Sequence, residues 1–322
     1  MKSGSRWGTA VIVLLVLASA FPFYWAIVSS LTPEAALYER RSLIPATLVL
    51  DHYRALFAER DFLVPIRNSL IVAGSTTVFC VTVGGLCAYA LARLRFRGKA
   101  PILGLILAVS VFPQIAVISP LYLVLRELRL INTYPGLILP YLTFAMPLTV
   151  WLLVGFFRQL PAELEEAAMV DGASRLRALR EIILPLAVPG LATTAILTFV
   201  YSWNEFLFAL SFTLGPERQT VPVAIALFRG QYQVPWGQIL AAAIVATTPV
   251  ALLVLLFQRR IVQGLTAGAV KGSPWHRCGS KASARPTPTG TWPRAASTSR
   301  SRTASSWCWW GRRDAARARR SG

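Results

Sequence analysis

The sequence predicts an all-α, polytopic membrane protein with six transmembrane helices. Its composition is 55% hydrophobic with a mean hydropathy of +0.53, well above that of a soluble domain. Six apolar runs recur along the chain, and each is long enough to cross about 30 Å of hydrocarbon as a helix. Basic residues gather in alternate connections between these runs, which predicts that both termini are cytoplasmic.

The first apolar run covers residues 8–28. The tripeptide at 18–20, Ala-Ser-Ala, resembles a signal-peptidase site, but the apolar stretch continues well past it. We therefore expect an uncleaved span. The segment 29–67 mixes acids and bases and contains several prolines, which is typical of a long connection outside the membrane. One short helix is expected in it, from Asp51 to Phe57.

The remaining spans are expected at about 70–91, 101–125, 135–157, 188–210 and 238–257. The third span contains Pro113 and Pro120, which predicts a kink. The connection before it is the strongest cytoplasmic marker in the chain because four basic residues crowd together there. They are Arg93, Arg95, Arg97 and Lys99.

A polar stretch, residues 160–189, is patterned as two short amphipathic helices joined at Gly172. Acids fill its first half and arginines its second, and apolar residues recur at helical spacing in both. Gly172 lies where one helix ends and the next begins, a position that favours a positive φ. The second helix should be capped by Asp171 or Ser174 and ended by the prolines at its far side, Pro185 and Pro189.

This stretch resembles the EAA loop of the permease subunits of ABC importers. The resemblance lies in Glu166-Ala167-Ala168, Asp171-Gly172-Ala173 and Ile182-x-Leu184-Pro185. In that family the loop is a cytoplasmic coupling helix that docks in a groove of the ATP-hydrolysing subunit. The resemblance therefore implies an ATPase-coupling role for Glu166, Ala167, Ala168, Asp171, Gly172, Ala173, Ile182 and Pro185. An amphipathic hairpin at the membrane interface is the alternative.

The resemblance extends over residues 8–272 and favours sugar-importer permeases of the maltose type. It is carried by residues 68–72, 220–223 and 264–272 (NSLIV, TVPV and GLTAGAVKG). It implies an inner-membrane subunit in contact with lipid, paired with a second permease and two ABC ATPase subunits, and supplied by an extracytoplasmic substrate-binding protein. It also implies alternating access, driven by ATP and Mg²⁺ on the ATPase subunits, with no cofactor on this chain.

Three other functions remain as alternatives. The chain could serve an ABC importer for a phosphorylated polyol or an amino acid. An ion-driven secondary transporter would require ionisable residues deep within its spans, and this chain has almost none there. A membrane scaffold without transport activity is the third alternative.

Neither catalysis nor nucleic-acid binding is predicted. The sequence contains no GxxxxGK[ST] loop to cradle ATP phosphates, and its two histidines lie in the first long connection and the tail. No Cys or His spacing indicates a metal site. The net charge of +19 does not by itself indicate nucleic-acid binding. More than half of it comes from the residues from Gly272 onward, which contribute eleven basic side chains and one acidic one.

A substrate path is predicted around the fifth span. Trp203, Asn204 and Glu205 combine an aromatic face, an amide and a carboxylate, as sugar sites commonly do, and they resemble the SWNEF stretch of sugar-importer permeases. Gln114, beside the kink at Pro113, is a further candidate. The alternatives are a membrane-interface role for the tryptophan and interhelical hydrogen bonding for Asn204 and Glu205.

Three regions follow from these patterns. Residues 1–67 hold the first span and its connection, and residues 68–272 hold the permease core. Residues 273–322 are rich in Arg, Ser, Thr and Pro without an apolar period, so we expect a disordered basic tail. Lipid or partner binding by this tail is the alternative to its having no evolved role.

Overall fold

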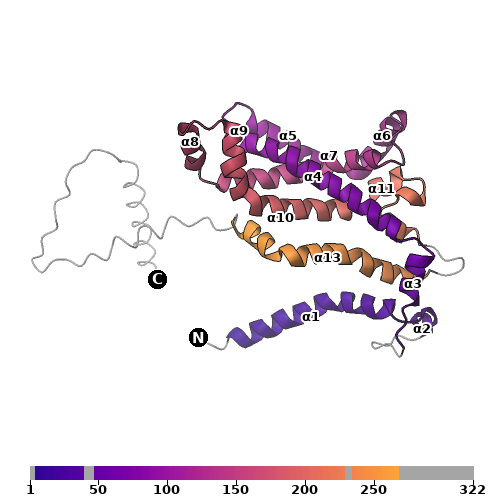
Figure 1. Ribbon diagram of the computed structural model, residues 1–322. Helices are drawn as coiled ribbons and strands as arrows, with labels where there is room; N and C mark the ends of the chain where they lie inside the picture. The colour runs from indigo at the N-terminus through magenta and orange to yellow at the C-terminus, as the bar shows by residue number, and fades with distance from the viewer. Residues whose placement is uncertain (1–3, 40–46, 229–233, 268–322) are drawn as a thin grey trace, which may run out of the picture. The chain divides into compact units, whose positions relative to one another are not determined.

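The computed structural model describes residues 4–39, 47–228 and 234–267, and every regular element within them is a helix (Figure 1). The expected tail, residues 273–322, lies outside the described residues, as does the end of the GLTAGAVKG segment.

Five helical stretches in the described part of the chain are long and apolar enough to cross a membrane. They are α1 (Gly4–Ser30), α4 (Leu63–Arg93), α7 (Tyr134–Gln159), the segment from α9 through α10 (Arg175–Trp203), and α13 (Trp236–Ala267). A sixth span is completed by two shorter helices, α5 (Lys99–Val111) and α6 (Gln114–Glu127), if they are counted together. The predicted six-span, all-α class therefore agrees with the structure.

The third span is broken into two helices at a sharp bend, rather than kinked within one helix as predicted. The axes of α5 and α6 differ by 94°, and the break falls at Phe112 and Pro113, which both have extended backbone angles. Proline disfavours a helical conformation in the residue before it and supplies no N–H for the helix ladder. Pro120, in contrast, lies inside α6 without ending it.

The core forms where α4, α7 and α10 (Leu184–Trp203) pack together (Figure 1). The hydroxyls of Thr149 on α7 and Thr198 on α10 are 2.8 Å apart and fully buried. Gly84 on α4 lies against the Met146 side chain of α7, so small residues allow these helices to approach closely. Helix α13 packs against α10, and α1 packs against α13.

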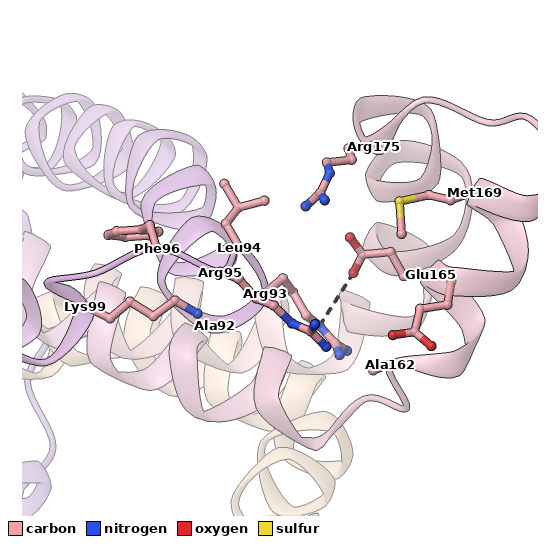
Figure 2. A pocket seen from close by; sticks show the side chains of 11 residues that line it. Ala92, Arg93, Leu94, Arg95, Phe96, Lys99, Ala162, Glu165, Met169 and Arg175 are labelled. Carbon is pink, nitrogen blue, oxygen red and sulfur yellow. Dashed lines mark ion pairs between the residues drawn. The ribbon is translucent and has the colours of Figure 1, made fainter.

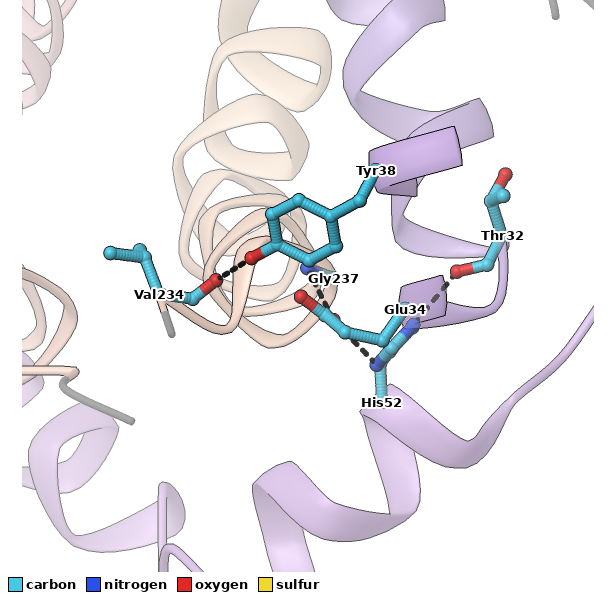
Figure 3. A network of polar contacts seen from close by, with 6 residues as sticks. All are labelled: Thr32, Glu34, Tyr38, His52, Val234 and Gly237. Atoms are coloured by element: carbon cyan, nitrogen blue, oxygen red, sulfur yellow. Dashed lines mark hydrogen bonds and ion pairs between the residues drawn. The ribbon is translucent and has the colours of Figure 1, made fainter. Parts of the chain in front are cut away.

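The described residues of the long connection after α1 contain two short helices, α2 (Glu34–Glu39) and α3 (Asp51–Ala58). Helix α3 confirms the short helix expected from Asp51 to Phe57, whereas α2 was not predicted. Polar contacts fix this connection to the start of α13 (Figure 3). Glu34 Oε2 accepts a hydrogen bond from Gly237 N at 3.1 Å, and Tyr38 donates to the Val234 carbonyl. His52 is buried beside them, with Nε2 2.8 Å from the Thr32 carbonyl oxygen.

The start of α4 is fixed to the connection after α11 (Leu207–Phe212). Asn68 is fully buried, and its Nδ2 donates to the carbonyls of Glu217 and Gln219 at 3.0 and 2.9 Å. Its Oδ1 accepts from the Tyr134 hydroxyl at 2.8 Å. This connection includes a 3₁₀ turn (Pro216–Arg218) and α12 (Val221–Ala226).

Nearby, Asn132 Nδ2 donates to Glu217 Oε1 at 2.8 Å. This hydrogen bond lowers the pKa of the exposed Glu217 carboxyl below its usual value. The same corner therefore joins α4, α7 and the connection after α11 through side-chain amides.

The fifth span differs from its predicted limits of 188–210. Helix α10 ends at Trp203, and residues 207–212 form the separate helix α11. At the other end the span begins well before residue 188, because α9 (Arg175–Ala178) continues into α10 through a π-helical turn, Leu179–Ile183.

Candidate functional site

The EAA-like stretch begins with helix α8 (Glu163–Val170), whose first turn contains three glutamates next to the positive end of the helix dipole. The helix ends at Asp171 and Gly172. Gly172 has a φ of +88°, which confirms the predicted left-handed position. Ala173 N then donates to the Ala168 carbonyl at 2.9 Å, which closes the end of the helix.

Helix α9 starts at Ser174, whose hydroxyl accepts a hydrogen bond from Arg177 N at 3.3 Å. Of the two predicted caps, Ser174 is therefore the one that caps the second helix, and Asp171 ends the first. This sharp turn joins α8 directly to α9, the start of the fifth span.

The expectation that Pro185 and Pro189 end the second helix is wrong. The chain runs through both prolines into α10. In the preceding π turn, Leu184 N donates to the Leu179 carbonyl, five residues back. The wider turn shifts the hydrogen-bond ladder just before Pro185, which occupies the first turn of α10, where a missing N–H costs little.

A buried anchor holds α8 against the end of α4. The Tyr89 hydroxyl donates to Glu165 Oε1 at 2.6 Å. Arg93 Nη2 donates to the Leu160 carbonyl at 2.7 Å, and its Nε lies 3.9 Å from Glu165 Oε2 (Figure 2). Glu165 is only 6% exposed, so this carboxylate is satisfied within the chain.

Sequence reasoning did not select this anchor. The available signal was a pair of polar residues, Tyr89 and Arg93, one helical turn apart at the end of an apolar run, and a glutamate next to the EAA glutamate. That signal did not indicate which of the two adjacent glutamates would face the protein.

The other residues of the stretch divide between two faces. Glu166, Ala167, Asp171 and Pro185 are exposed, Ala173 and Ile182 are half-buried, and Ala168 is buried against the rest of the chain. The most exposed large apolar side chains of this stretch are Val170 at 87% and Leu176 at 71%. Glu166 and Val170 are one turn apart and share a face of α8. A charged residue beside exposed apolar ones is typical of a protein-binding surface.

The predicted path residues of the fifth span have different surroundings. Trp203 is 4% exposed, stacks on Phe199 at 5.6 Å between ring centroids, and packs in a core cluster with Leu56 and Phe62. Glu205 is also buried, and its two carboxylate oxygens accept from Phe208 N at 2.9 Å and Ala209 N at 3.2 Å. It therefore caps α11.

Asn204 and Gln114 are more accessible. Asn204 is exposed, and its Nδ2 donates to the Val200 carbonyl at 2.8 Å. Gln114, the first residue of α6, is half-buried, and its Nε2 donates to the Tyr201 hydroxyl at 2.8 Å. Tyr201 precedes Asn204 by three residues on the same face of α10. The structure thus brings the start of α6 and the end of α10 together.

Within the described residues, no three His, Cys, Asp or Glu side chains are grouped so that they could hold a metal ion.

Comparisons with known proteins support an assignment. The family described as "Binding-protein-dependent transport system inner membrane component" matches residues 80–267. The trehalose transport system permease protein SugB of Mycobacterium tuberculosis is 46% identical, over 84% of this chain and 100% of its own length. The trehalose/maltose transport system permease protein MalG of Thermococcus litoralis is 41% identical, over 81% of this chain and 94% of its own length.

Solved structures with a similar fold include a chain of an ABC transporter. A chain in the crystal structure of a bacterial ABC transporter that imports the acidic polysaccharide alginate superposes with a TM-score of 0.70. It is 22% identical in sequence, and the match covers 80% of this chain and 98% of that one. This match supports the fold alone, whereas the sequence relatives support the family.

Proposed function

This chain belongs to the family of inner membrane components of binding-protein-dependent transport systems, and from that premise we propose that it carries a sugar across the membrane in steps driven by an ATPase subunit docked on α8. It is a multi-pass permease subunit of an ABC importer and not itself an enzyme. The proposal concerns its substrate, its partners and the route of coupling.

A sugar or a small glycoside is the proposed substrate class. The relatives are named for trehalose, for trehalose and maltose, and for sulfoquinovosyl glycerol, the last at 42% identity over 80% of this chain. These compounds share several hydroxyl groups and a glycosidic linkage. The shared chemistry favours a carbohydrate over a phosphorylated polyol or an amino acid.

The surface formed by Glu166, Val170 and Leu176 is the proposed ATPase-docking face. The observation that carries this proposal is the contrast between two neighbouring glutamates. Glu165 is buried on Tyr89 and Arg93, whereas Glu166 is exposed beside apolar side chains. A helix anchored on one face and open on the other is suited to transmit a push from a docked partner into the spans.

Helix α4 provides a route for that push. It is 31 residues long, about 46 Å at the usual rise per residue. Its last turns contain Tyr89 and Arg93, which hold α8, and its first turns contain Asn68, which holds the connection after α11 at the opposite end. Movement of α8 would therefore reach both ends of the bundle through one continuous helix, as alternating access requires.

The proposed assembly includes two ABC ATPase subunits that bind ATP and Mg²⁺, a second permease and an extracytoplasmic substrate-binding protein. One structural relative, an alginate ABC transporter, is in complex with a periplasmic protein that binds an alginate pentasaccharide. We assign α8 to the cytoplasmic side, because Arg93, Arg95 and Lys99, at the corner from α4 to α5, line a groove with α8. The alternation of six spans then puts both termini on the same side.

The substrate path is proposed to pass the corner where α6 meets α10. Gln114 offers a half-buried amide there, bonded to the hydroxyl of Tyr201, and Asn204 offers an exposed amide at the end of α10. Trp203 and Glu205 would support this corner from behind, by packing and by capping α11.

Transport in purified vesicles tests this function. The chain is co-expressed with its partner subunits, reconstituted, and supplied with ATP and its binding protein. We expect ATP-dependent uptake of labelled trehalose or maltose, and no uptake of glycerol phosphate or amino acids. Uptake of glycerol phosphate or an amino acid would contradict the proposed substrate class. Sugar uptake without ATP hydrolysis would contradict the proposed mechanism.

A further inference from the structure

A groove of about 810 Å³ opens between the end of α4, the corner that leads to α5, and α8 (Figure 2). Four cationic side chains and two carboxylates line it. They are Arg93, Arg95, Lys99 and Arg175, with Glu165 and Glu166. Coupling through α8 uses Glu165, Glu166 and Arg93 of this lining and assigns no role to the other three cations, Arg95, Lys99 and Arg175.

The charges of the groove are not balanced within the chain. Glu165 is bound by Tyr89 and Arg93. Arg95, Lys99 and Arg175 form no ion pair with a carboxylate among the described residues. Glu166 is the one carboxylate of the lining without an ion pair in that part of the chain, so the unpaired cations outnumber it. A bound anion would offset this excess of positive charge.

The groove also lies where a lipid headgroup would be. Helix α4 ends at Arg93 and α5 begins at Lys99, so the corner between them marks the end of two apolar helices. Exposed apolar side chains continue from the groove along α5. Phe96, beside Lys99, is 42% exposed, Ile102 41% and Leu105 71%. Basic pockets at the ends of spans are suited to anionic lipid headgroups.

We propose that this groove binds the phosphate of an anionic phospholipid, with Arg95, Lys99 and Arg175 around the headgroup and the acyl chains along α5. The bound phosphate bridges the α4–α5 corner and the α8–α9 unit, which otherwise meet at the Glu165 anchor. Inorganic phosphate shares the recognised group but lacks acyl chains, so a direct comparison identifies the source of the ligand.

Lipid binding is measured on the full-length chain with the subunits that co-purify with it, without ATP, so that the result does not depend on transport. Native mass spectrometry counts retained phosphatidylglycerol and phosphatidylcholine, with inorganic phosphate as a competitor. The test variant is Arg95→Gln with Lys99→Gln. The matched control is Arg97→Gln, an exposed arginine of the same corner that does not line the groove.

We expect selective retention of phosphatidylglycerol, weakened about fivefold for each groove cation removed and unchanged in Arg97→Gln. Competition by millimolar inorganic phosphate with no lipid selectivity would assign the site to a soluble phosphate. Equal loss in Arg97→Gln, or no selectivity for either ligand, would overturn the proposal. So would occupation of the groove by an acidic segment of a co-purified subunit. The variant Lys99→Arg keeps the charge and should retain the lipid, which separates loss of binding from misfolding.

Discussion

Tyr89 near the end of α4 and Glu165 on α8 are 76 residues apart in the chain, and a 2.6 Å hydrogen bond joins them. The acceptor is a carboxylate with little solvent access, so the bond is of the stronger, charge-assisted kind. Arg93 adds a second link from α4 to the segment just before α8. Helix α8 therefore cannot move far without taking the end of α4 with it.

Replacing Tyr89 by Phe should weaken the coupling of transport to ATP hydrolysis without preventing assembly of the transporter. The variant keeps the ring that packs edge-on against Phe157 at 6.1 Å and removes only the hydroxyl. The lost bond to a charged group is worth about 1.5–3 kcal/mol, enough to loosen α8 but small beside the packing of the spans. We expect normal assembly and fewer sugar molecules transported per ATP hydrolysed, measured in the same vesicles.

Tyr122→Phe is the control for this variant, because the Tyr122 ring packs on Phe212 and its hydroxyl has no hydrogen bond to the described residues. An unchanged ratio of transport to hydrolysis in Tyr89→Phe would show that the anchor does not transmit movement.

Replacing Glu166 by Lys should weaken ATPase binding directly. Glu166 is exposed and forms no ion pair within the described part of the chain, so the charge reversal acts on the docked partner. We expect reduced retention of the ATPase subunit during purification and reduced substrate-stimulated hydrolysis. Glu163→Lys, an exposed change one turn earlier in the same helix, controls for the helix dipole. Equal retention of the ATPase in wild type and Glu166→Lys would argue against this docking face.

Local patterns predicted much of this structure. The glycine between two amphipathic segments implied a positive φ at Gly172, and Ser174 preceded the second of them in a capping position. Helix α3 began at Asp51, where an acidic residue starts a short amphipathic run. Each of these features depends on residues within a few positions in the chain, so its signal was present in the sequence.

Other features depended on distant residues and were missed for that reason. Glu165 and Glu166 are alike in sequence, and the position of Tyr89 decides which is buried. Trp203 is covered by Leu56 and Phe62, far away in the chain. A different miss was local: Pro185 does not end the second helix, because the π turn before it shifts the hydrogen bonds and places Pro185 in the first turn of α10.

Replacing Gln114 or Asn204 by Ala should change the affinity for the transported sugar. Both amides lie at the corner where α6 meets α10, and neither side chain supports the core. We expect the apparent KM for uptake to rise several-fold, about 1 kcal/mol for each lost hydrogen bond, with the amount of assembled complex unchanged. Thr143→Ala, an exposed change on α7, is the control. Unchanged uptake kinetics in both variants would remove this corner from the path.

Replacing Gly237 by Ala should destabilise the contact between the first long connection and α13. A Cβ at this position would lie 2.3 Å from ring atoms of His52, which is buried and cannot easily move away. We expect a lower melting temperature of the purified subunit, from a loss of about 1–3 kcal/mol. Gly74→Ala, where a Cβ meets no atom within 4 Å, should have little effect. Equal melting temperatures for the two variants would contradict the packing at His52.

Substitutions at Gly172 should impair coupling in proportion to the strain that they place on the turn. A Cβ at this position meets no atom within 4 Å, so crowding contributes nothing and the backbone alone decides the effect. At a φ of +88°, Val is strongly disfavoured, Ala less so, and Asn least, because its short polar side chain tolerates the left-handed region. The cost for Val is about 1–3 kcal/mol, small beside the stability of the packed spans but sufficient to change the angle between α8 and α9. We therefore expect all three variants to reach the membrane in equal amounts, while ATPase retention and substrate-stimulated hydrolysis fall in the order Gly172→Asn, Gly172→Ala, Gly172→Val.

Gly155→Val on α7, where a Cβ also meets no atom within 4 Å and φ is not positive, controls for the added side chain. If Gly172→Val binds and stimulates the ATPase as the wild type does, the shape of this turn is not what the partner recognises, and the docking face must lie elsewhere.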